Sequence, residues 1–456
     1  MSASPARRIA FEVLRRVQAE DAYASDLLHA KLTDGVSRAD AGLATELTMG
    51  VLRWQRLLDF LLHPHLNRPG AKLDVEVLTA LRMGLYQMRF LDRVPVSAAV
   101  SESVELVKGA RKRSAAPLVN AVLRKIGPQA RIAGEALQAR LPAAMTEAER
   151  MGILHSHPTW LVERWLTRFG KERTLALLEA NNRAPKLCCA VMDAEQVERA
   201  SQSLSAEGLD VTAGRWLKAS LSVSGGNVAA AKAVQSGIVS IQDEASQMVA
   251  RILGAGRGDI VLDLCAAPGG KARILARAVA PEGMVIAGDT HLHRLRAARA
   301  QMTRTRTNGI SWLALDATQP LPFSERFKRI LLDAPCSGTG TLARNPEIRW
   351  RLQPGDLDAA HGRQTAMLRQ ALGSLRPGGR LVYATCSLEP EENEQVVHEA
   401  VAQDQSLRIG NGTEALRPWL RSGVAAATLF DADGFFRTFP PESATDGFFA
   451  VVLEPC

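Results

Sequence analysis

The 456 residues of this chain are too many for one hydrophobic core, so roughly two or three domains are expected. A content of 46% hydrophobic and 23% charged residues is typical of a soluble globular protein. Charges interrupt every apolar stretch between residues 1 and 19, which predicts neither a signal peptide nor a membrane span, and hence a cytoplasmic protein without a membrane partner.

The six cysteines show neither the paired spacing of a zinc site nor the density of a secreted disulfide framework. We therefore expect no metal and no disulfide framework. Free thiols in a reducing compartment fit this pattern, and any function of a cysteine must then come from its packing or from its own chemistry.

The net charge of +8 is concentrated near the N-terminus, because residues 1–140 hold 21 Lys/Arg against 14 Asp/Glu. Binding to a polyanion needs such a basic segment, since phosphate contacts supply affinity that does not depend on sequence. An ordinary solvated helical surface would give the same excess of charge. Charge alone leaves both interpretations open.

Residues 1–130 are predicted to form an all-helical domain. Apolar residues recur there at helical spacing, as in Ile9, Val13 and Val17, and prolines such as Pro64 and Pro95 mark helix boundaries. The stretches RRIAFEVLRRV, ADAGLATELTMGVLRWQRLLDFLL and VNAVLRKI resemble the NusB-like RNA-binding domain. That resemblance implies RNA as a partner.

Residues 131–240 are predicted to be a connecting region. Helical segments come first, and short apolar runs with Gly and Ser turns between residues 186 and 239 then favour a small α+β subdomain. Trp160 and Trp165 lie among apolar residues at helical spacing, so we expect them to pack in a core rather than stack on bases.

Residues 241–456 are predicted to have an α/β fold, because strands such as ILLDAP (330–335) and RLVYATCS (380–387) alternate with helices. This alternation indicates a mostly parallel sheet covered by helices on both faces. The final run, GFFAVVLEP (447–455), is expected to be an antiparallel strand, as in the methyltransferase fold that this region resembles.

A glycine-rich turn follows the apolar strand in DIVLDLCAAPGGKA (259–272). Ligands of an open parallel sheet collect beyond the carboxyl ends of the strands, and Gly269 and Gly270 would let a cofactor approach the backbone closely. Asp289 ends the next strand, where a carboxylate accepts hydrogen bonds from ribose hydroxyls, and Asp316 follows at the adenine side. An NAD site is the alternative, but the G-x-G-x-x-G pattern is missing.

Two cysteines follow predicted strands in separate motifs, Cys336 in DAPCSGTG (333–340) and Cys386 in YATCSLEPEENE (383–394). Carbon 5 of a cytosine becomes nucleophilic when a thiolate adds to carbon 6, and a second group must later help to expel the enzyme. Asp333 could contact ring nitrogen 3, where charge builds. Spacing alone does not tell which cysteine attacks, and the proline–cysteine nucleophile of DNA cytosine methyltransferases would select Cys336.

Together the motifs resemble the RNA 5-methylcytosine methyltransferases of the Sun/Nop family. The resemblance implies a Rossmann-like class I methyltransferase core, Cys386 as the nucleophile, Cys336 as the release residue and Asp333 as a third catalytic residue. It also implies S-adenosylmethionine as the cofactor, held by Cys265, Ala266, Ala267, Pro268, Gly269, Gly270, Lys271, Asp289, Asp316 and Asp333.

A NusB-like domain before such a core most resembles the bacterial methyltransferases of 16S rRNA, so 16S rRNA is the expected substrate and a monomer the expected state. The target base must be single-stranded or flipped out of a helix, and Arg344, Arg349 and Arg351 could hold the RNA backbone around it. A tRNA or 23S rRNA enzyme and a catalytically idle RNA-binding assembly factor remain the alternatives.

Overall fold

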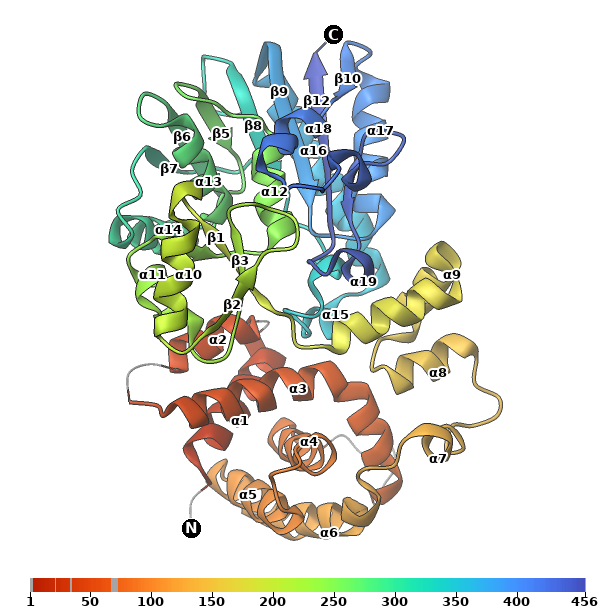
Figure 1. Cartoon of the computed structure of the whole chain (residues 1–456). Coiled ribbons are helices and arrows are strands. Elements are labelled where there is room, and N and C mark those ends of the chain that lie inside the picture. Colours follow the sequence, from red (N-terminus) through yellow and green to blue (C-terminus); the bar gives the residue numbers. More distant parts are fainter. Residues whose placement is uncertain (1–2, 21, 33–34, 67–72, 456) are drawn as a thin grey trace. The chain divides into compact units, whose positions relative to one another are not determined.

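The computed structural model describes residues 3–20, 22–32, 35–66 and 73–455. The chain divides into two compact units (Figure 1). The helical unit comprises residues 1–184 and 342–352, and the sheet unit comprises residues 185–341 and 353–456. The polypeptide therefore leaves the sheet unit for a short segment in its second half and then returns. Within the described residues, no helix is both long and apolar enough to span a bilayer.

Helix α4 (Val75–Phe90) lies at the centre of the helical unit, surrounded by α1 (Pro5–Glu20), α3 (Arg38–Leu62), α5 (Val96–Gly109) and α6 (Ala116–Ile126) (Figure 1). Most of its side chains are buried, as expected of a helix enclosed on all sides. The other helices of this unit are α2 (Ala24–Lys31), α7 (Gly134–Gln138), α8 (Glu147–Leu154), α9 (Thr159–Asn182) and α15 (Ile348–Arg351). The all-helical prediction is confirmed, and the unit continues past residue 130 through α9.

The segment 342–352 packs within the helical unit through its arginines. Arg349 is fully buried, and its Nη1 donates to Oδ1 of Asn182 at 2.8 Å. Arg351 Nη2 donates to the carbonyl oxygen of Val17 at 2.7 Å. The expectation that Arg349 holds an RNA backbone is wrong, because its guanidinium is enclosed and bonded to oxygens of the protein itself.

The sheet unit begins with a small α+β subdomain, as predicted. Its four-stranded antiparallel sheet has the order β2 (Asp210–Ala213), β3 (Ser220–Ser224), β1 (Leu187–Val191) and β4 (Val239–Ile241). Two helices accompany it, α10 (Val197–Ala206) and α11 (Lys232–Gln235). Buried residues of the strands and of α10 form a separate small core.

The large sheet of this unit is mostly parallel. Its order is β10 (Leu407–Gly410), β12 (Phe448–Pro455), β9 (Leu375–Thr385), β8 (Phe327–Asp333), β5 (Ile260–Asp263), β6 (Met284–Asp289) and β7 (Ile310–Ala314), with β11 (Phe436–Thr438) beside β12. The five strands from β9 to β7 are parallel, whereas β12 runs antiparallel to β9. The antiparallel final strand predicted from the sequence is thereby confirmed.

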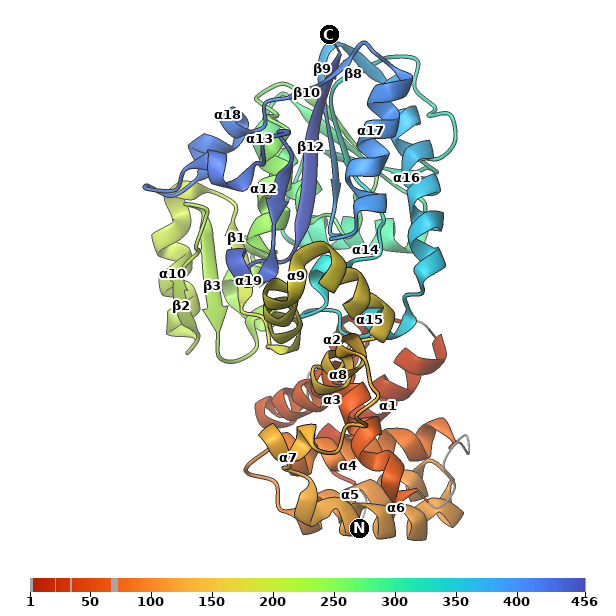
Figure 2. The same ribbon diagram turned by 90° about the vertical axis from the view of Figure 1, so that its right-hand side faces the viewer.

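Helices cover both faces of the large sheet (Figure 2). Because successive side chains of a strand point to opposite faces, Val382 joins the core beneath α12 (Glu244–Ile252) and α13 (Gly270–Val279), while Tyr383 joins the core beneath α16 (Pro354–Gly373) and α17 (Glu394–Gln403). The remaining helices are α14 (Leu292–Arg304), α18 (Thr413–Leu416) and α19 (Pro440–Ser443). The α/β class and the two helical layers are confirmed.

Candidate active site

Polar side chains occupy the carboxyl edge of the large sheet in the order of its strands. Cys386 directly follows β9, Asp333 ends β8, Asp263 ends β5, Asp289 ends β6, and Asp316 lies just beyond β7. Parallel strands end at the same edge, so neighbouring strands bring these residues together although the sequence separates them. The two cysteine motifs and the proposed cofactor residues therefore lie side by side along one edge.

The glycine turn between β5 and α13 is a tight structure. Gly269 has a φ of +103°, which residues with a side chain rarely adopt, and a Cβ there would meet Cε of Met302 at 3.1 Å. The N–H of Ala266 donates to the carbonyl oxygen of Gly288 at 2.8 Å and so ties the turn to β6. The turn leads directly into α13, whose first N–H groups have no partner within the helix.

Asp289 is buried, and its carboxylate is held from two sides. Oδ1 accepts from the N–H of His291 at 2.8 Å, and Oδ2 accepts from Nη1 of Arg294 at 3.2 Å. The Nη2 of Arg294 also donates to the carbonyl oxygen of Ala267 at 3.0 Å. Arg294, which the sequence analysis missed, thus connects the ribose-binding candidate to the glycine turn.

Asp316 is an exposed carboxylate beyond β7. It accepts from the N–H and the hydroxyl of Thr318 at 2.9 and 2.7 Å. These hydrogen bonds lower the pKa of Asp316 below its usual value. The residue is therefore an ionised acceptor beside the strand that carries Asp289, the position expected for an adenine-side contact.

Asp263 is a further candidate that the sequence analysis used only as a landmark. It is buried, and neither carboxylate oxygen has a hydrogen bond of normal geometry within the described residues. Burial, together with the charge of Asp333, raises the pKa of Asp263 to about 8. The charge of Lys271 and the N–H of Cys265 only partly offset this shift. An enclosed carboxylate with unused acceptor capacity is a favourable contact for a cationic group of a ligand.

Lys271, in the first turn of α13, forms an ion pair with Asp333. Its Nζ lies 2.7 Å from Oδ2 of Asp333 and 5.1 Å from the ring centroid of Phe448. Burial alone would lower the pKa of Lys271, but the charge of Asp333 and the hydrogen bond to it leave the pKa raised. Lys271 therefore carries a positive charge beside the catalytic motifs.

The two motif cysteines are in direct contact. Their Sγ atoms lie 3.3 Å apart, and the N–H of Cys386 donates to Sγ of Cys336 at 3.3 Å. The hydrogen bond to Cys386 and burial raise the pKa of Cys336 well above its ordinary value. Cys336 is therefore a protonated thiol near neutral pH. The two residues expected to attack and to assist release are in contact in the structure.

Glu392 connects the loops that carry the two cysteines. Its Oε1 accepts from the N–H of Ser337 at 2.7 Å and from Nε2 of Gln364 at 3.1 Å, and the Ser337 hydroxyl lies 3.0 Å from that of Ser387. Burial raises the pKa of Glu392, although the hydrogen bonds from Ser337 oppose the shift. Its place within the acidic run EPEENE was the only sequence signal for this residue.

The other cysteines of the described chain do not add a reactive group. Cys265 lies in the turn, and burial raises the pKa of its thiol above the ordinary value, which disfavours a thiolate. Cys188 and Cys189 are buried in β1 of the small subdomain. Among the described residues, no cluster of His, Cys, Asp or Glu could hold a metal ion.

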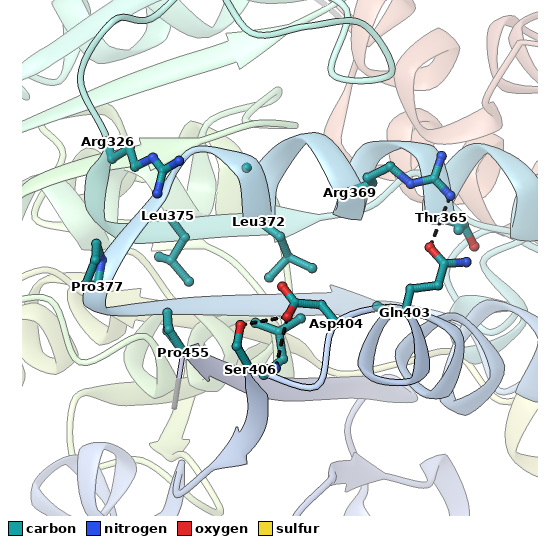
Figure 3. A pocket seen from close by; sticks show the side chains of 13 residues that line it. Arg326, Thr365, Arg369, Leu372, Leu375, Pro377, Gln403, Asp404, Ser406 and Pro455 are labelled. Atoms are coloured by element: carbon teal, nitrogen blue, oxygen red, sulfur yellow. Dashed lines mark hydrogen bonds between the residues drawn. The ribbon is translucent and has the colours of Figure 1, made fainter.

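Two cavities of the sheet unit open away from this site, at the amino edge of the large sheet, where its parallel strands begin. One, of about 550 Å³, is lined by Arg369 and Leu372 at the end of α16 and by Leu375 and Pro377 at the start of β9 (Figure 3). The other, of about 470 Å³, lies where α12 and α13 end. None of the candidate catalytic or cofactor residues lines either cavity, so chemistry and not cavity size identifies the site.

Three family models match the chain. Residues 250–454 match the 16S rRNA methyltransferase RsmB/F model. Residues 4–128 match the NusB family, and residues 157–228 match the RsmF/B-like ferredoxin-like domain. The order of the three matches is the order of the helical region, the small subdomain and the large sheet.

Relatives match over nearly the whole chain. The "Probable ribosomal RNA small subunit methyltransferase B" of Bacillus subtilis (strain 168) is 33% identical, covering 96% of this chain and 98% of its own length. The "Ribosomal RNA small subunit methyltransferase B" of Pseudomonas putida (strain KT2440) is 34% identical, covering 90% and 92%. The crystal structure of PH0851 has the same fold, with a TM-score of 0.81 at 24% identity over 99% of both chains. The chain thus belongs to the RsmB/F family of 16S rRNA methyltransferases.

Proposed function

We propose that the protein transfers a methyl group to carbon 5 of a cytosine in 16S rRNA through a covalent adduct with Cys386. The observation that carries this proposal is the 3.3 Å contact between Cys386 and Cys336 at the sheet edge that also holds Lys271 and Asp333. Covalent catalysis at carbon 6 needs one group to attack and another to assist release. Two touching thiols on neighbouring strands supply both.

The residues at the ends of β5, β6 and β7 fit S-adenosylmethionine. The enclosed carboxylate of Asp263 suits a cation, and this cofactor carries an ammonium and a sulfonium group. Asp289 is placed to accept from ribose hydroxyls and Asp316 from the adenine amino group, while the turn 265–271 offers backbone N–H groups. When bound, the cofactor supplies the methyl group.

Cys386 is the attacking residue in this proposal, and Lys271 stabilises its thiolate. Asp333 holds Lys271 at the end of β8, next to the end of β9 that Cys386 follows, so its ammonium group is a cation available to the sulfur. Cys336 keeps its proton because of its hydrogen bond and its burial. As the Cys386 thiolate forms the bond to carbon 6, Asp333 passes to ring nitrogen 3 the proton that it shares with Lys271, because negative charge builds on that nitrogen.

Release requires that the proton on carbon 5 leaves before the bond between carbon 6 and sulfur breaks. Once Cys386 is bonded to carbon 6, its negative charge no longer raises the pKa of Cys336, so Cys336 can lose its own proton to solvent. Its Sγ, which lies beside the attacking sulfur, then accepts the proton of carbon 5. Glu392 fixes the geometry by holding Ser337, the residue after Cys336. Attack and release are thereby assigned to different residues at a fixed separation.

The names of the relatives and the charge of the N-terminal residues both support 16S rRNA as the substrate. Relatives named as small-subunit rRNA methyltransferases match nearly the whole chain, and residues 1–140 carry an excess of Lys/Arg over Asp/Glu that favours RNA phosphates. A target base inside a duplex cannot present carbon 6 to a thiolate, so it must be unpaired or flipped out. Cytoplasmic location and a monomeric state remain predictions.

Mapping 5-methylcytosine in rRNA and tRNA tests the proposal. Cells without the protein should lack a 5-methylcytosine of 16S rRNA, and the wild-type chain but not Cys386→Ala should restore it. Loss of a modification in tRNA or 23S rRNA instead would contradict the substrate. If a radiolabelled methyl group never reached total RNA from the purified protein, catalysis itself would be excluded.

A further inference from the structure

The cavity of about 470 Å³ at the amino edge, which we call the arginine cavity, lies between the small subdomain and the helices α12 and α13. The methyl-transfer chemistry proposed above uses none of its residues. Those that matter for its chemistry are Met192, Asp193, Glu195, Arg251, Arg277 and Trp419.

Arg251 is a buried cation that has no counterion among the described residues. The residue is 9% exposed, and its Nε is enclosed without a hydrogen-bond partner. Across the described ranges of the chain, its side chain makes no hydrogen bond and no ion pair, and its one contact of note is with the ring of Trp419, whose centroid lies 3.9 Å from Cζ. Burial lowers the pKa of Arg251 to about 10. Enclosing a charge without a partner is costly, so an anionic ligand in the cavity would complete this site.

Trp419 is a preformed surface in the same cavity. Its carbonyl oxygen accepts from the N–H of Lys218 at 2.9 Å, and the N–H of Arg421 donates to the carbonyl oxygen of Trp216 at 2.9 Å. These bonds hold the backbone on both sides of Trp419, a residue that is 37% exposed although the Arg251 guanidinium covers one face of its ring. A fixed aromatic ring beside an arginine favours a ligand that combines a flat ring with an anion.

The two carboxylates of the cavity restrict where an anion can lie. Asp193 already accepts from the N–H of Glu195 at 3.0 Å and from Nε2 of Gln196 at 3.3 Å. Among the described residues, neither carboxylate forms an ion pair with Arg251. An anion is therefore favoured on the arginine side of the cavity, and the carboxylate side offers acceptors to hydroxyl groups.

We propose that the arginine cavity binds one nucleotide, with its phosphate on Arg251 and Arg277, its base against Trp419 and its ribose toward Asp193 and Glu195. The nucleotide belongs either to the substrate RNA, at a place far along the strand from the reacting base, or to a free mononucleotide. The RNA source rests on the proposed function, whereas the mononucleotide source does not.

Calorimetry on the full chain tests the site. The protein is saturated with S-adenosylhomocysteine to fill the cofactor site and is titrated with uridine monophosphate or with a hexamer of uridines. Arg251→Gln should weaken the binding of at least one of these ligands by about tenfold or more, as expected when a charge-assisted hydrogen bond is removed. Arg257→Gln is the matched control, because Arg257 lies outside the cavity and pairs with Glu282 at 2.7 Å.

The two ligands distinguish an RNA nucleotide from a free mononucleotide as the natural occupant of the arginine cavity. A loss confined to the hexamer identifies an RNA nucleotide, and a loss for the monophosphate identifies a free nucleotide. Wild-type affinity of Arg251→Gln for both ligands, or an equal loss in Arg257→Gln, would overturn the proposal. A monophosphate effect in a protein that methylates no RNA would keep this site and reject the proposed function.

Folding is checked with the same variants. Among the described residues the side chain of Arg251 makes no hydrogen bond, and its enclosed charge is costly, so Arg251→Gln should unfold at or above the wild-type Tm and keep the wild-type affinity for S-adenosylhomocysteine. Arg277 is exposed, so Arg277→Gln serves as a second variant that leaves the core untouched and should show a smaller loss of affinity for the same ligand. If neither variant binds more weakly than the control, the cavity is not a nucleotide site.

Discussion

The two edges of the large sheet differ in how their charges are partnered. At the carboxyl edge, reactive groups hold one another, as in the Lys271–Asp333 pair and the contact between Cys336 and Cys386. At the amino edge, Arg251 lines the arginine cavity and has no counterion among the described residues. Groups that contact one another are preorganised for catalysis. A buried charge without a partner instead indicates a place where a ligand can bind.

Two buried arginines, Arg349 and Arg251, differ in the same way, because only one of them has hydrogen-bond partners within the protein. Burial lowers the pKa of both, to about 9 for Arg349 and to about 10 for Arg251. Arg349 donates to oxygens of the helical unit, among them the carbonyl of Asn181 at 3.1 Å, whereas Arg251 donates to none. Burial of a cation is therefore a structural feature in one place and a candidate binding feature in the other.

The largest expected effect is the loss of methyl transfer when the carboxyl edge, but not the amino edge, is altered. Cys386→Ala removes the attacking sulfur, so methyl transfer to RNA should fall below detection. Arg257→Gln, a change at the amino edge outside the cavity, should keep the wild-type rate. Single-turnover transfer of a radiolabelled methyl group measures both. Substantial activity in Cys386→Ala would show that the contacts at the carboxyl edge are structural.

A second test compares carboxylates at the two edges. Asp289→Ala should remove a charge-assisted hydrogen bond worth about 1.5 to 3 kcal/mol, so cofactor affinity should fall about ten- to a hundredfold. Asp404, which accepts from the N–H of Ser406 at 2.9 Å and lines the cavity of Figure 3, gives the matched control Asp404→Ala. Calorimetry with S-adenosylmethionine should find no change in that control, and an unchanged affinity in folded Asp289→Ala would refute the ribose contact.

A third test uses the pH dependence of Asp263. A carboxyl group whose pKa is raised on folding stabilises the protein fully below its ordinary pKa of 3.8, and that contribution disappears as the pH rises to about 8. Asp263→Asn stays neutral, so its Tm without cofactor should exceed that of the wild type by more at about pH 8 than at about pH 5. Its cofactor affinity should fall about tenfold. A pH-independent difference in Tm would contradict the raised pKa.

The smallest expected effect concerns the helical unit. Deleting residues 1–140 would remove the basic residues, but it would also remove hydrogen-bond partners of Arg351 such as Val17. Replacing single basic residues by neutral ones tests their contribution to RNA binding without that loss. Arg113, Arg124 and Lys125 are exposed, and their joint replacement by Gln should reduce the slope of log affinity against log salt by about one for each RNA phosphate that is no longer neutralised. Fluorescence titration of RNA over several salt concentrations measures this slope, and an unchanged slope would exclude these residues from the RNA interface.

The carboxyl-edge site was predictable because its motifs stand at strand ends. Cys336, Cys386, Asp333 and Asp289 each follow an apolar run, and parallel strands place such residues at one edge. The roles of Arg294 and Glu392 were not predictable, because they depend on which loops become neighbours. Arg349 misled the sequence analysis, since an arginine that binds protein carbonyls and one that binds phosphate look the same before burial is known.

The sequence was enough to predict the small subdomain, but it was not enough to predict where residues 342–352 pack. Gly and Ser turns were enough to predict an α+β subdomain, because strand and turn signals are local. The membership of residues 342–352 in the helical unit depends on contacts with residues about three hundred positions earlier, such as the bond from Arg53 to the carbonyl oxygen of Ala343 at 2.8 Å. No local pattern encodes such a partner.

The division of labour between the two cysteines is the central claim, and a denaturing gel of both variants with substrate RNA and S-adenosylmethionine tests it most directly. Cys336→Ala should attack, transfer the methyl group and then stall as a protein–RNA adduct that survives denaturation. Cys386→Ala should form no adduct, because it lacks the attacking sulfur. An adduct in Cys386→Ala but not in Cys336→Ala would contradict the account and make Cys336 the nucleophile.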